Sequence, residues 1–572
     1  MMPLVRQGLL FAERWPDTPA LAVYPRGART PSVLRTWGAL RERVRACAAM
    51  LVQGGAKACD RIAILAGNRE LWPVADLAIQ SLRAVGVGVH TSSTPAQVDG
   101  LLRDSGARWL LTDDPAAAKR LMASPPVGIR LEGVVLDGDP DTMVDVPADV
   151  AMWDAWLETG VAALRASPSL GPTLDARLAS VKPDDLAALI YTSGSTGEPK
   201  GACISHRNLA ASAASIVSVL GLTRADRAVS YLPFAHAAER VFGQATRLAT
   251  GMAAALIEDP ADLFAVCAHY QPTVLGGLPR IFERLDEAAE LARRAGDDPR
   301  AAIEARLGQA VRLATSGGAA LPAAVAERLG ALGVSVVGAY GQTEHLCIAM
   351  NRPDAPQFDS VGPPMPGTEV RVADDGELLV RRSALTFDGY WQRPADTAAA
   401  FTADGAWLRT GDRATVGGDG RLHLIGRVKE LLALSTGRKV APVPIESALV
   451  ASPYIAHAVC IGEGRKFVVA LLSPRRALVE AWARASGAGA PWDALAASAT
   501  VQGLLQEAVD AVNVTLARPD RVQGVIVVPD EFTTDNGLLT PTLKVRRQAV
   551  EDRYAALIEA CYTAMTAAAG SA

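Results

Sequence analysis

Short apolar runs, each followed by a turn and then by a helical pattern, organise the first half of the sequence. Residues 61–66 form such a run, which a Gly-Asn pair closes before the helical pattern of residues 72–82. Residues 109–112 and 133–137 repeat the apolar run and also end in turn-forming residues. Strands that are apolar throughout are typical of parallel sheets covered by helices on both faces. The sequence therefore predicts an α/β fold with largely parallel, buried strands.

The character of the sequence changes after about residue 350. In residues 367–372, 376–381 and 420–425, apolar and polar residues alternate, and Asp-Gly turns lie between these segments. A period of two is typical of strands with one buried face, and Asp-Gly is a common hairpin turn. We therefore expect antiparallel strands in this region, in a barrel or a curled sheet.

A chain of 572 residues exceeds what one hydrophobic core usually serves, and it predicts about two to four domains. Helical patterns and apolar strands return beyond Arg427, so we place a domain boundary there. The expected arrangement is a large N-terminal domain over residues 1–427, made of α/β subdomains and a β-rich subdomain at about 350–427. A small α+β C-terminal domain is expected over residues 428–572.

The overall charge argues against nucleic acid as a partner. The formal net charge is −4, the isoelectric point is about 6.1, and no dense lysine and arginine cluster overrides that average. Hydrophobic residues make up 49% and charged residues 21% of the chain, as in ordinary globular enzymes. The seven cysteines are scattered and form no CxxC pair, so we expect neither a disulfide framework nor a structural zinc site.

The sequence contains no segment typical of secretion or of a membrane span. Residues 1–10 lack a long apolar core and a small-residue cleavage site, and charged residues follow soon after. A membrane-spanning helix needs a run of about 18 apolar residues, and none occurs. We therefore expect a cytoplasmic protein with at most peripheral membrane contact.

Residues 191–201 combine glycines and hydroxyl residues directly after an apolar run. Glycine permits positive φ angles and lets backbone N–H groups approach an anion, while hydroxyl and ammonium groups add donors and positive charge. The candidate phosphate-binding residues are Thr192, Ser193, Gly194, Ser195, Thr196, Gly197 and Lys200. Their order matches neither a Walker loop nor a dinucleotide fingerprint. A surface linker rich in serine and glycine is the alternative.

This loop resembles the signature loop of the adenylate-forming (ANL) superfamily, which includes acyl-CoA synthetases, peptide-synthetase adenylation domains and luciferases. Further segments resemble family blocks, in the family's order, over nearly the whole chain. They are residues 231–240 (YLPFAHAAER), 278–284 (LPRIFER), 316–320 (SGGAA), 338–344 (GAYGQTE), 410–412 (TGD) and 426–430 (GRVKE). The resemblance is closest to the long-chain fatty acyl-CoA synthetase branch, and it implies an AMP-binding enzyme with a mobile C-terminal domain.

The resemblance implies a reaction in which a carboxylate attacks the α-phosphorus of ATP and expels pyrophosphate. Because both reactants are anions, cations and oriented donors must offset their repulsion. Glu344 matches the family's Mg²⁺ ligand, and an ordinary glutamate at a helix start is the alternative. Lys544 matches the lysine that bridges the substrate carboxylate and the α-phosphate, and a mobile domain would carry it to and from the site. A lysine on a helix surface is the alternative for Lys544.

For the nucleoside, Tyr340 resembles the aromatic residue that stacks on adenine, with a buried core tyrosine as the alternative. Gly318 and Ala319 fall where the family's backbone lines the adenine. Asp412 resembles the carboxylate that accepts hydrogen bonds from the ribose hydroxyls, with a turn aspartate as the alternative. The further candidate ATP- and AMP-binding residues are Gly341, Gln342, Thr343 and Arg427.

For the thioester-forming step, the resemblance implies that the small domain rotates about a hinge and presents a second face to the site. Lys429 stands at the hinge position, and a solvated surface charge is the alternative. Gly437 falls where a family glycine lets pantetheine pass, and Lys439 is a candidate contact for coenzyme A (CoA), with a solvated basic residue as the alternative. His236 matches the histidine that lines the acyl site, a satisfied core histidine being the alternative.

The predicted function is that of an ATP-dependent carboxylate–CoA ligase, with ATP, CoA and a hydrophobic carboxylic acid as substrates and Mg²⁺ as cofactor. A long-chain fatty acid is the first choice of acid. The segment between Arg284 and Leu313 is shorter than that branch usually carries, which leaves an aromatic or polycyclic acid as an alternative. The rival functions are an acyl-AMP ligase that loads a carrier protein and a non-enzymatic lipid-binding homologue. A homodimer is an assembly compatible with the sequence.

Overall fold

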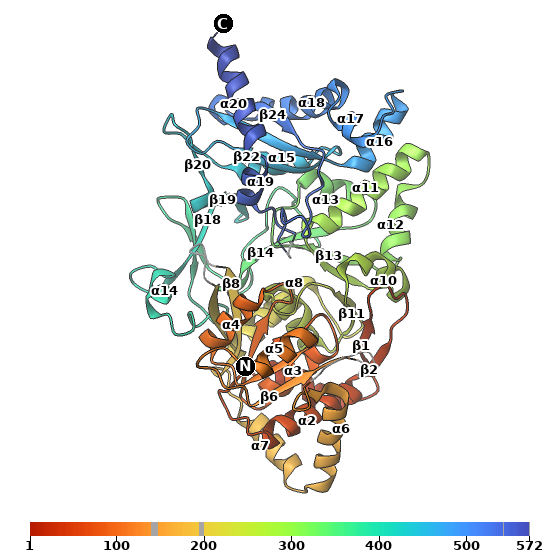
Figure 1. Cartoon of the computed structure of the whole chain (residues 1–572), viewed down its shortest axis with the longest axis vertical. Coiled ribbons are helices and arrows are strands. Elements are labelled where there is room, and N and C mark those ends of the chain that lie inside the picture. The colour runs from red at the N-terminus through yellow and green to blue at the C-terminus, as the bar shows by residue number, and fades with distance from the viewer. Residues whose placement is uncertain (139–146, 194–198, 541–542, 571–572) are drawn as a thin grey trace.

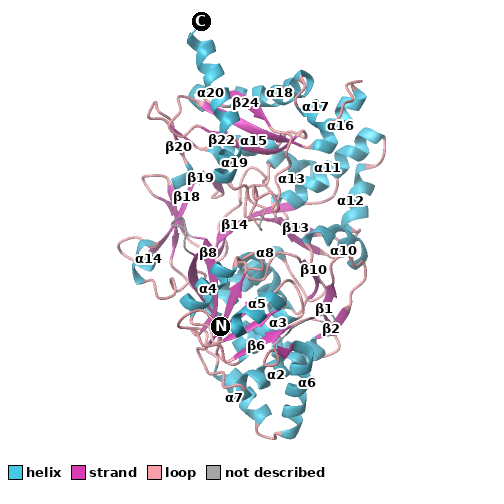
Figure 2. Cartoon of the chain, in the orientation of Figure 1, coloured by secondary structure: helices cyan, strands magenta, loops and turns pink. Residues whose placement is uncertain are grey.

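The computed structural model describes residues 1–138, 147–193, 199–540 and 543–570. Two large sheets and their helices form most of the molecule, and the C-terminal segments are stacked at one end of it (Figure 1). The strands lie inside and the helices lie mostly over their faces (Figure 2). This architecture confirms the predicted α/β class.

The first large sheet has seven strands in the order β7-β6-β5-β3-β4-β8-β9, and all of them except β9 run parallel to their neighbours. Its strands are β3 (Arg61–Leu65), β4 (Val85–Val89), β5 (Trp109–Thr112), β6 (Gly133–Leu136), β7 (Ala151–Met152), β8 (Leu186–Ser193) and β9 (Pro199–Ser205). The strands predicted from the three apolar runs are therefore confirmed as β3, β5 and β6.

Both faces of this sheet are covered, which explains why its strands are apolar throughout. Ile62 and Ile64 of β3 face one core, and Ala63 and Leu65 face another, because side chains alternate along a strand. The helices that cover the two faces are α2 (Trp37–Gln53), α3 (Leu71–Ser81), α4 (Pro95–Ser105), α5 (Pro115–Ala123), α6 (Trp153–Ala166) and α7 (Leu170–Ser180). The helix predicted over residues 72–82 is confirmed as α3.

The second large sheet has eight strands in the order β15-β14-β13-β12-β10-β11-β1-β2, with antiparallel strands at its two edges. Its strands are β1 (Pro19–Tyr24), β2 (Val33–Thr36), β10 (Arg227–Ser230), β11 (Ala253–Ile257), β12 (Val274–Gly277), β13 (Leu313–Ser316), β14 (Val336–Gln342) and β15 (His345–Met350). One face packs against α10 (Leu263–Tyr270), α11 (Pro279–Ala295), α12 (Pro299–Leu307) and α13 (Ala323–Ala331).

The core shared with the first sheet contains the remaining helices of this part of the chain. They are α1 (Leu4–Arg14), α8 (His206–Leu220), the π-helix η1 (Glu239–Ala245) and α9 (Thr246–Thr250). Ser205 begins α8 as a capping box, since its side chain accepts from the Asn208 N–H while the Asn208 side chain accepts from the Ser205 N–H.

The segment after residue 350 forms a third sheet, and the predicted antiparallel strands are confirmed there. The strands β16 (Val370–Val372), β17 (Glu377–Arg381), β18 (Trp407–Val416) and β19 (Leu422–Arg427) follow one another as a meander. Within the described residues this sheet is open at β16 and β19, so these strands do not close into a barrel. The short helix α14 (Pro394–Ala399) lies in the connection between β17 and β18.

Beyond Arg427 the chain forms a three-stranded sheet with a separate core on each face. Its strands are β22 (Ile455–Ile461), β23 (Val468–Pro474) and β24 (Val522–Val527), after the short hairpin of β20 (Leu432–Ala433) and β21 (Lys439–Val440). Its helices are α15 (Pro442–Val450), α16 (Arg476–Ala485), α17 (Trp492–Ala496), α18 (Ala499–Thr515), α19 (Arg547–Arg553) and α20 (Ala555–Gly570). The domain boundary between residues 427 and 428 stays a prediction.

Helix α11 connects the C-terminal segments to the second large sheet (Figure 1). The Arg294 guanidinium donates to the Tyr454 hydroxyl at 2.8 Å, and Arg280 forms an ion pair with Glu531 at 3.3 Å. The buried Arg475 side chain comes within 3.9 Å of Asp286 of α11. These contacts hold the C-terminal segments against α11, which packs on the second sheet.

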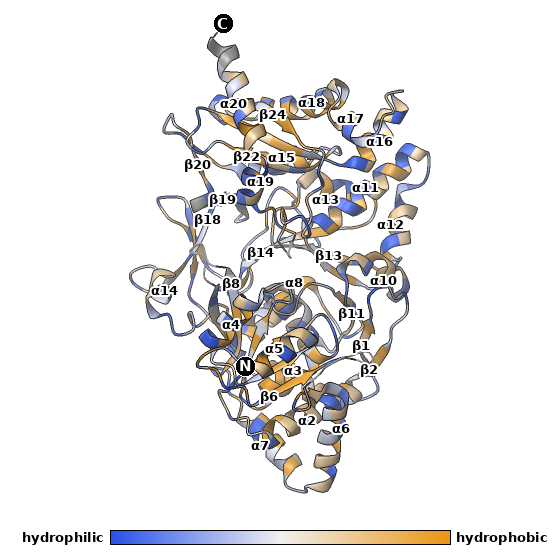
Figure 3. Ribbon diagram, in the orientation of Figure 1, coloured by the Kyte–Doolittle hydropathy of each residue, from blue (hydrophilic) through white to orange (hydrophobic). Residues whose placement is uncertain are grey.

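Hydrophobic residues are concentrated in the sheets, whereas the helices show mixed hydropathy (Figure 3). Among the helices that the structure describes, none is both long and apolar enough to cross a bilayer. All seven cysteines are free, as the scattered spacing predicts.

Candidate active site

A continuous cavity of about 3490 Å³ lies where the parallel strands of the second sheet end and the C-terminal segments begin to cover them. The loops that follow β10, β12, β13 and β14 all leave the sheet at this edge, because parallel strands share the direction of their carboxyl ends. Segments far apart in the sequence meet there, among them the residues around His236, Glu344, Asp412 and Lys544. The site is thus assembled at the kind of sheet edge where α/β enzymes bind ligands.

Asp412 is the centre of a hydrogen-bonded group on one wall of the cavity. The Tyr340 hydroxyl donates to Asp412 Oδ2 at 2.6 Å, and Arg427 Nε lies 2.9 Å from Oδ1. Asp412 and Arg427 face each other across the β18–β19 ladder, while Tyr340 comes from β14. Burial raises the pKa of the Asp412 carboxyl, and Arg427 and Tyr340 oppose that rise. The group is an oriented acceptor held by three elements.

Gly318 and Ala319 form part of the floor of the cavity, directly after β13. Gly318 has a φ of +80°, a left-handed conformation that favours glycine. A side chain at this position would also come within 3.2 Å of Leu278 and 4.0 Å of the Lys544 side chain. Glycine therefore allows the turn and the close packing against Leu278, and the Lys544 side chain lies next to it.

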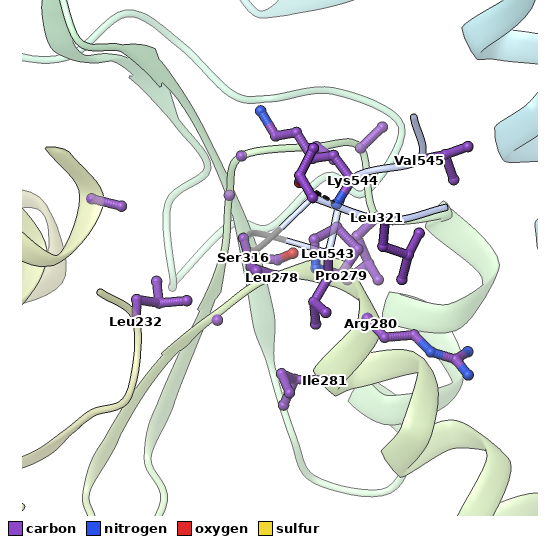
Figure 4. Close-up of a pocket in the computed structure, with 18 of the residues that line it drawn as sticks. Leu232, Leu278, Pro279, Arg280, Ile281, Ser316, Leu321, Leu543, Lys544 and Val545 are labelled. Carbon is purple, nitrogen blue, oxygen red and sulfur yellow. Dashed lines mark hydrogen bonds between the residues drawn. The ribbon is translucent and has the colours of Figure 1, made fainter. Parts of the chain in front are cut away.

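Lys544 reaches the cavity from a tight turn in the C-terminal segment (Figure 4). Its backbone N–H donates to Thr540 Oγ1 at 3.0 Å, and the Thr540 N–H donates to the Lys544 carbonyl at 2.8 Å. Figure 4 shows Lys544 and Leu543 on the same pocket as Leu278 and Ser316, which follow from β12 and end β13. Protein surrounds the ammonium group even though it meets solvent in the cavity. This burial lowers its pKa, as does Arg427, while Asp412 opposes the decrease.

Glu344 lies at another wall of the cavity, next to a residue that sequence reasoning missed. The Tyr390 hydroxyl donates to Glu344 Oε1 at 2.5 Å. Tyr390 is held by a β-bridge to Ala202 of β9, and burial raises its pKa, with Glu344 contributing. The only sequence signal for Tyr390 was an aromatic pair after Gly389, which is too common to single out.

The donors around Glu344 are compatible with magnesium. Within the described residues, no three histidine, cysteine or acidic side chains converge to form a complete metal site. Mg²⁺ is usually held by one or two carboxylates together with phosphate oxygens and water, so a single carboxylate that lines the cavity is compatible with it. Glu344 supplies such a carboxylate.

The hairpin of β8 and β9 brings Thr192 and Lys200 to the cavity, directly opposite each other in register. The Lys200 ammonium forms an ion pair with Asp396 and lies 5.6 Å from the centre of the Tyr390 ring. Gly194, Ser195, Thr196 and Gly197 lie outside the described residues, and the Ser193 side chain does too. The predicted phosphate loop is therefore represented only by its two flanks.

His236 enters the cavity from the loop after β10, and its protonation state follows from its contacts. The Ala238 N–H donates to His236 Nδ1 at 3.1 Å, so the proton of the neutral ring is on Nε2. The pKa of His236 is lowered to about 4, mainly by burial and in addition by the nearby His90 and Lys544. The His90 ring lies 6.5 Å from the His236 ring and also lines the cavity. His90 carried no motif signal in the sequence.

Six predicted residues remain, and only some of them line the cavity. Gly341, Gln342 and Thr343 line the cavity at the turn between β14 and β15. Gly437 and Lys439 do not line it. They belong to the exposed β20–β21 hairpin, where Gly437 has a φ of +82°. Lys429 lies in a short 3₁₀ turn, and its side chain is outside the described residues.

Two family models match most of the chain. Residues 10–391 match the model of the AMP-binding enzyme family, and residues 429–566 match the AMP-binding enzyme C-terminal domain. The chain belongs to the AMP-binding enzyme family, which confirms the resemblance to the adenylate-forming superfamily. It is therefore an enzyme.

Individual relatives of the chain are long-chain-fatty-acid–CoA ligases. The chain is 31% identical over 565 residues to the long-chain-fatty-acid–CoA ligase FadD15 of Mycobacterium bovis, covering 91% of each chain. It is 28% identical over 600 residues to the human long-chain-fatty-acid–CoA ligase 1, covering 94% of this chain and 84% of the relative. These matches confirm the resemblance to the long-chain branch.

Solved structures share the fold. The anthranilate CoA ligase AuaEII in complex with anthranoyl-AMP has a TM-score of 0.77 at 20% identity, covering 98% of both chains. The ATP-bound RpMatB-BxBclM chimera B1 has a TM-score of 0.74 at 24% identity, covering 97% of this chain and 99% of the other. At these identities the likeness concerns the fold alone.

Proposed function

We propose that this enzyme is an ATP-dependent carboxylate–CoA ligase that activates a hydrophobic acid as acyl-AMP, with release of pyrophosphate, and then transfers the acyl group to CoA. The observation that carries the proposal is the convergence of Lys544 with Asp412, Gly318 and His236 in one cavity. A long-chain fatty acid is the proposed substrate, because the relatives that cover nine-tenths of the chain are named as long-chain-fatty-acid–CoA ligases.

In the first half-reaction the positive charge of Lys544 offsets the repulsion between the acid and the α-phosphate. The Lys544 side chain lies next to Gly318 of the proposed adenine site, and its ammonium also interacts with Asp412 on the ribose side. An ammonium in a partly desolvated cavity interacts more strongly with phosphate than one in water. Lys544 therefore both orients the carboxylate and stabilises the charge of the transition state.

The nucleotide is oriented by the Tyr340–Asp412–Arg427 group. Each oxygen of Asp412 already accepts one bond from the protein and keeps a further lone pair for a ribose hydroxyl. Glu344 is the residue that would hold Mg²⁺, which when bound neutralises phosphate oxygens. Tyr390 fixes the orientation of Glu344 through its 2.5 Å hydrogen bond.

To bind phosphate, Lys200 has to leave its ion pair with Asp396. In the present structure its ammonium is paired with Asp396. A polyphosphate carries more negative charge than one carboxylate, so it competes well for the ammonium. Asp396 holds the lysine at the edge of the site until ATP arrives.

The acid is received beside His236, where the walls of the cavity become apolar. His236 is neutral at physiological pH and offers its Nε2–H as a donor to a carboxylate or acyl oxygen. Leu222, Phe242 and Met252 line the same cavity, which suits an aliphatic chain. A second candidate is an aromatic acid, because the segment between Arg284 and Leu313 is shorter than the long-chain branch usually carries.

The second half-reaction is assigned by analogy with the CoA ligases. Gly437 and Lys439 lie away from the cavity, so their proposed role with CoA requires the rotation of the domain that carries them. A carrier protein is the alternative acceptor. We also propose that the protein is cytoplasmic and that it can form a homodimer.

The test is pyrophosphate release measured over a panel of fatty and aromatic acids, each with and without CoA. We expect release with long-chain acids and thioester formation only when CoA is present. Release without a thioester would support loading of a carrier protein instead, and absence of release with every acid would support a non-enzymatic homologue.

Lys544→Ala separates the two half-reactions. The variant is expected to lose adenylation by about 100-fold or more, because the transition state loses its cation. It should still convert supplied acyl-adenylate and CoA to the thioester at close to the normal rate. Lys466→Ala, which removes an exposed lysine elsewhere in the C-terminal segments, is the matched control. Equal loss of both half-reactions would contradict the role given to Lys544.

A further inference from the structure

The loop that carries His236 leaves the second large sheet, yet it packs against the carboxyl edge of the first. Residues 231–238, here termed the His236 loop, connect β10 to η1. Phe234 and Ala235 at the centre of this loop are buried in the core that the two sheets share. The first sheet also presents the β8–β9 hairpin, so the same element supports the proposed phosphate site and the proposed acid site.

Asn68 holds the start of the His236 loop from the turn that follows β3. Its side-chain amide donates to the Ser230 carbonyl at 3.1 Å and to the Leu232 carbonyl at 3.0 Å. Asn68 is only 5% exposed, and a buried hydrogen bond that is left unmade is costly. The amide therefore fixes the path of the loop relative to the first sheet.

The Glu239 carboxylate at the start of η1 holds the same segment from the other side. It accepts a hydrogen bond from the Ser230 hydroxyl, and the backbone of Leu232 supplies a further one. The two residues whose carbonyls accept from Asn68 therefore also donate to Glu239. His236 lies between these two attachments in the sequence, so the loop that carries it is held at both ends.

Two packing contacts hold the middle of the His236 loop. The Phe234 ring stacks on Trp72 of α3 with ring centroids 5.6 Å apart, and Trp72 Nε1 donates to the Ala66 carbonyl at 2.8 Å. A Cβ atom added to Gly88 of β4 would lie 3.0 Å from the Ala235 Cα. A larger residue at this glycine would therefore have to move the loop away from the first sheet.

We propose that Asn68 is a positioning residue for acid activation, because it holds the His236 loop where the imidazole can donate to the acid. The inference rests on the role proposed for His236 and adds the group that sets its place. The Ala238 N–H that orients the ring belongs to the same loop, so the ring moves with the loop. A displacement of about 1 Å at a reacting group can lower a rate about 100-fold.

The experiment is steady-state pyrophosphate release by Asn68→Asp, measured with the acid of the panel that gives the fastest release. The aspartate keeps the size of the side chain but has no N–H to donate to the two carbonyls. We expect kcat/KM for the acid to fall about 10- to 100-fold while the KM for ATP changes less than about twofold. The KM for ATP depends instead on the Tyr340–Asp412–Arg427 group, which β14, β18 and β19 hold.

A double-variant cycle with His236→Ala distinguishes positioning from a general loss of structure. The double variant Asn68→Asp, His236→Ala should be no slower than His236→Ala alone, since no imidazole is left to displace. Additive losses would overturn the proposal. If His236→Ala alone leaves the rate unchanged, the role of His236 is wrong, and the inference that rests on it fails as well.

Asn208 offers a matched control, because its side-chain amide also donates to two backbone carbonyls. These are the carbonyls of Ala384 and Thr386, at 3.0 and 2.8 Å. Asn208→Asp should lower the unfolding temperature as Asn68→Asp does, but its effect on kcat/KM for the acid should be the same with and without His236. A dependence on His236 in both variants would contradict a specific role for Asn68.

Gly88→Ala displaces the same loop without removing a hydrogen bond, so it decides the question even if Asn68→Asp does not fold. The added methyl group meets Ala235 and requires a shift of a few tenths of an ångström. We expect kcat/KM for the acid to fall about fivefold, and only when His236 is present. Gly100→Ala, at a glycine of α4 with open space around it, should have the normal rate. A normal rate in Gly88→Ala would overturn the proposal.

Discussion

The carboxylate of Asp412 is shared by two protein donors, and this sharing bears on the ribose-binding role proposed for it. Tyr340 fixes one oxygen at 2.6 Å and Arg427 fixes the other at 2.9 Å. Neither side chain of Asp412 or Tyr340 has to reorganise when a ribose arrives, because both are already ordered and largely buried. Preorganised acceptors of this kind bind without the entropic cost of ordering a free side chain.

Asp412→Asn tests this arrangement. The amide keeps the shape of the side chain but removes its charge and replaces one acceptor by a donor, which then faces Arg427 or the Tyr340 hydroxyl. The KM for ATP in pyrophosphate release is expected to rise about 10- to 100-fold, since a hydrogen bond to a charged group contributes about 1.5–3 kcal/mol. Tyr340→Phe should raise it only about fivefold. An unchanged KM in Asp412→Asn would refute the ribose role.

The motif residues at this scale were predictable, but their partners were not. Lys544, Asp412 and Glu344 stand within runs that match family blocks, and the structure brings them to one cavity. Tyr390 contacts Glu344, and Asp396 pairs with Lys200 across 196 positions of sequence. Such contacts depend on tertiary folding of the β-rich segment against β9, for which no local pattern exists.

At the scale of elements, the π-helix η1 is the least regular part of the core. Its widened turn brings the Glu239 carboxylate against Gly243, where an added Cβ would lie 1.9 Å from Oε1. The same carboxylate accepts a hydrogen bond from Ser230 at the end of β10. Insertions of this type inside helices are often retained at functional sites, and Glu239 lines the active-site cavity.

Gly243→Ala is expected to destabilise the fold by about 1–3 kcal/mol, because the methyl group displaces Glu239 from Ser230 or forces the helix to shift. Denaturant unfolding monitored by circular dichroism measures the change. Gly503→Ala is the control, since this helical glycine of α18 has open space around it and alanine favours helices there by about 1 kcal/mol. Equal effects of the two substitutions would contradict the packing described for η1.

The buried carboxyl group of Glu239 should also make the stability of the fold depend on pH. Burial raises its pKa to about 7, although Ser230 and Arg247 oppose the rise. Because the folded state holds this proton more tightly than the unfolded state, the stabilisation is complete below the usual pKa of a glutamate and is lost as the pH rises toward 7.

The variant Glu239→Gln does not titrate, so it isolates this contribution. From pH 5 to pH 7 the free energy of unfolding of the unaltered protein should fall relative to that of the variant, by at most about 1.4 kcal/mol per pH unit. Glu158→Gln, on the exposed side of α6, should show no such difference. A difference that is constant with pH would show that Glu239 does not titrate in this range.

Regular elements were predictable because each has its own period. The parallel strands β3, β5 and β6 follow from apolar runs, and α3 follows from its helical spacing. The π-helix was not predictable, since residues 239–245 have no pattern that distinguishes five-residue from four-residue hydrogen bonding. Within it, Glu239 and Gln244 make buried polar contacts with Ser230 and Arg247, which no local pattern predicts.

At the scale of the whole molecule, helix α11 supports the C-terminal segments over the active site. Asp286 of α11 accepts two hydrogen bonds from Arg328, at 2.8 and 2.7 Å, and also faces the buried Arg475 at 3.9 Å. A buried arginine without a nearby carboxylate is costly. Asp286 therefore contributes to the docking of the segments that carry Lys544.

Asp286→Asn should weaken this docking while leaving the separate cores intact. Limited proteolysis is expected to cleave within residues 428–438 about tenfold faster, because undocking exposes this connection more often. The far-ultraviolet circular dichroism spectrum should not change. Glu304→Gln, which alters an exposed ion pair with Arg300 on α12, serves as the control. Identical cleavage of both variants and the unaltered protein would contradict a docking role.

Long-range placement could be predicted only through the resemblance to a family. Composition and periodicity indicated several domains, yet neither indicates that the Lys544 side chain lies next to Gly318. That placement depends on contacts of α11 with residues more than a hundred positions later, such as Tyr454 and Glu531.

The assembly of the cavity from distant segments has a consequence during synthesis on the ribosome. Thr192, Glu344 and Asp412 emerge first, and the sheets that present them can form as they emerge, since N-terminal parts of a chain fold before later parts are made. The proposed catalytic ammonium arrives only with residue 544. From the roles proposed for these residues, we expect a ribosome-bound chain that has not reached residue 544 to bind nucleotide without adenylating an acid.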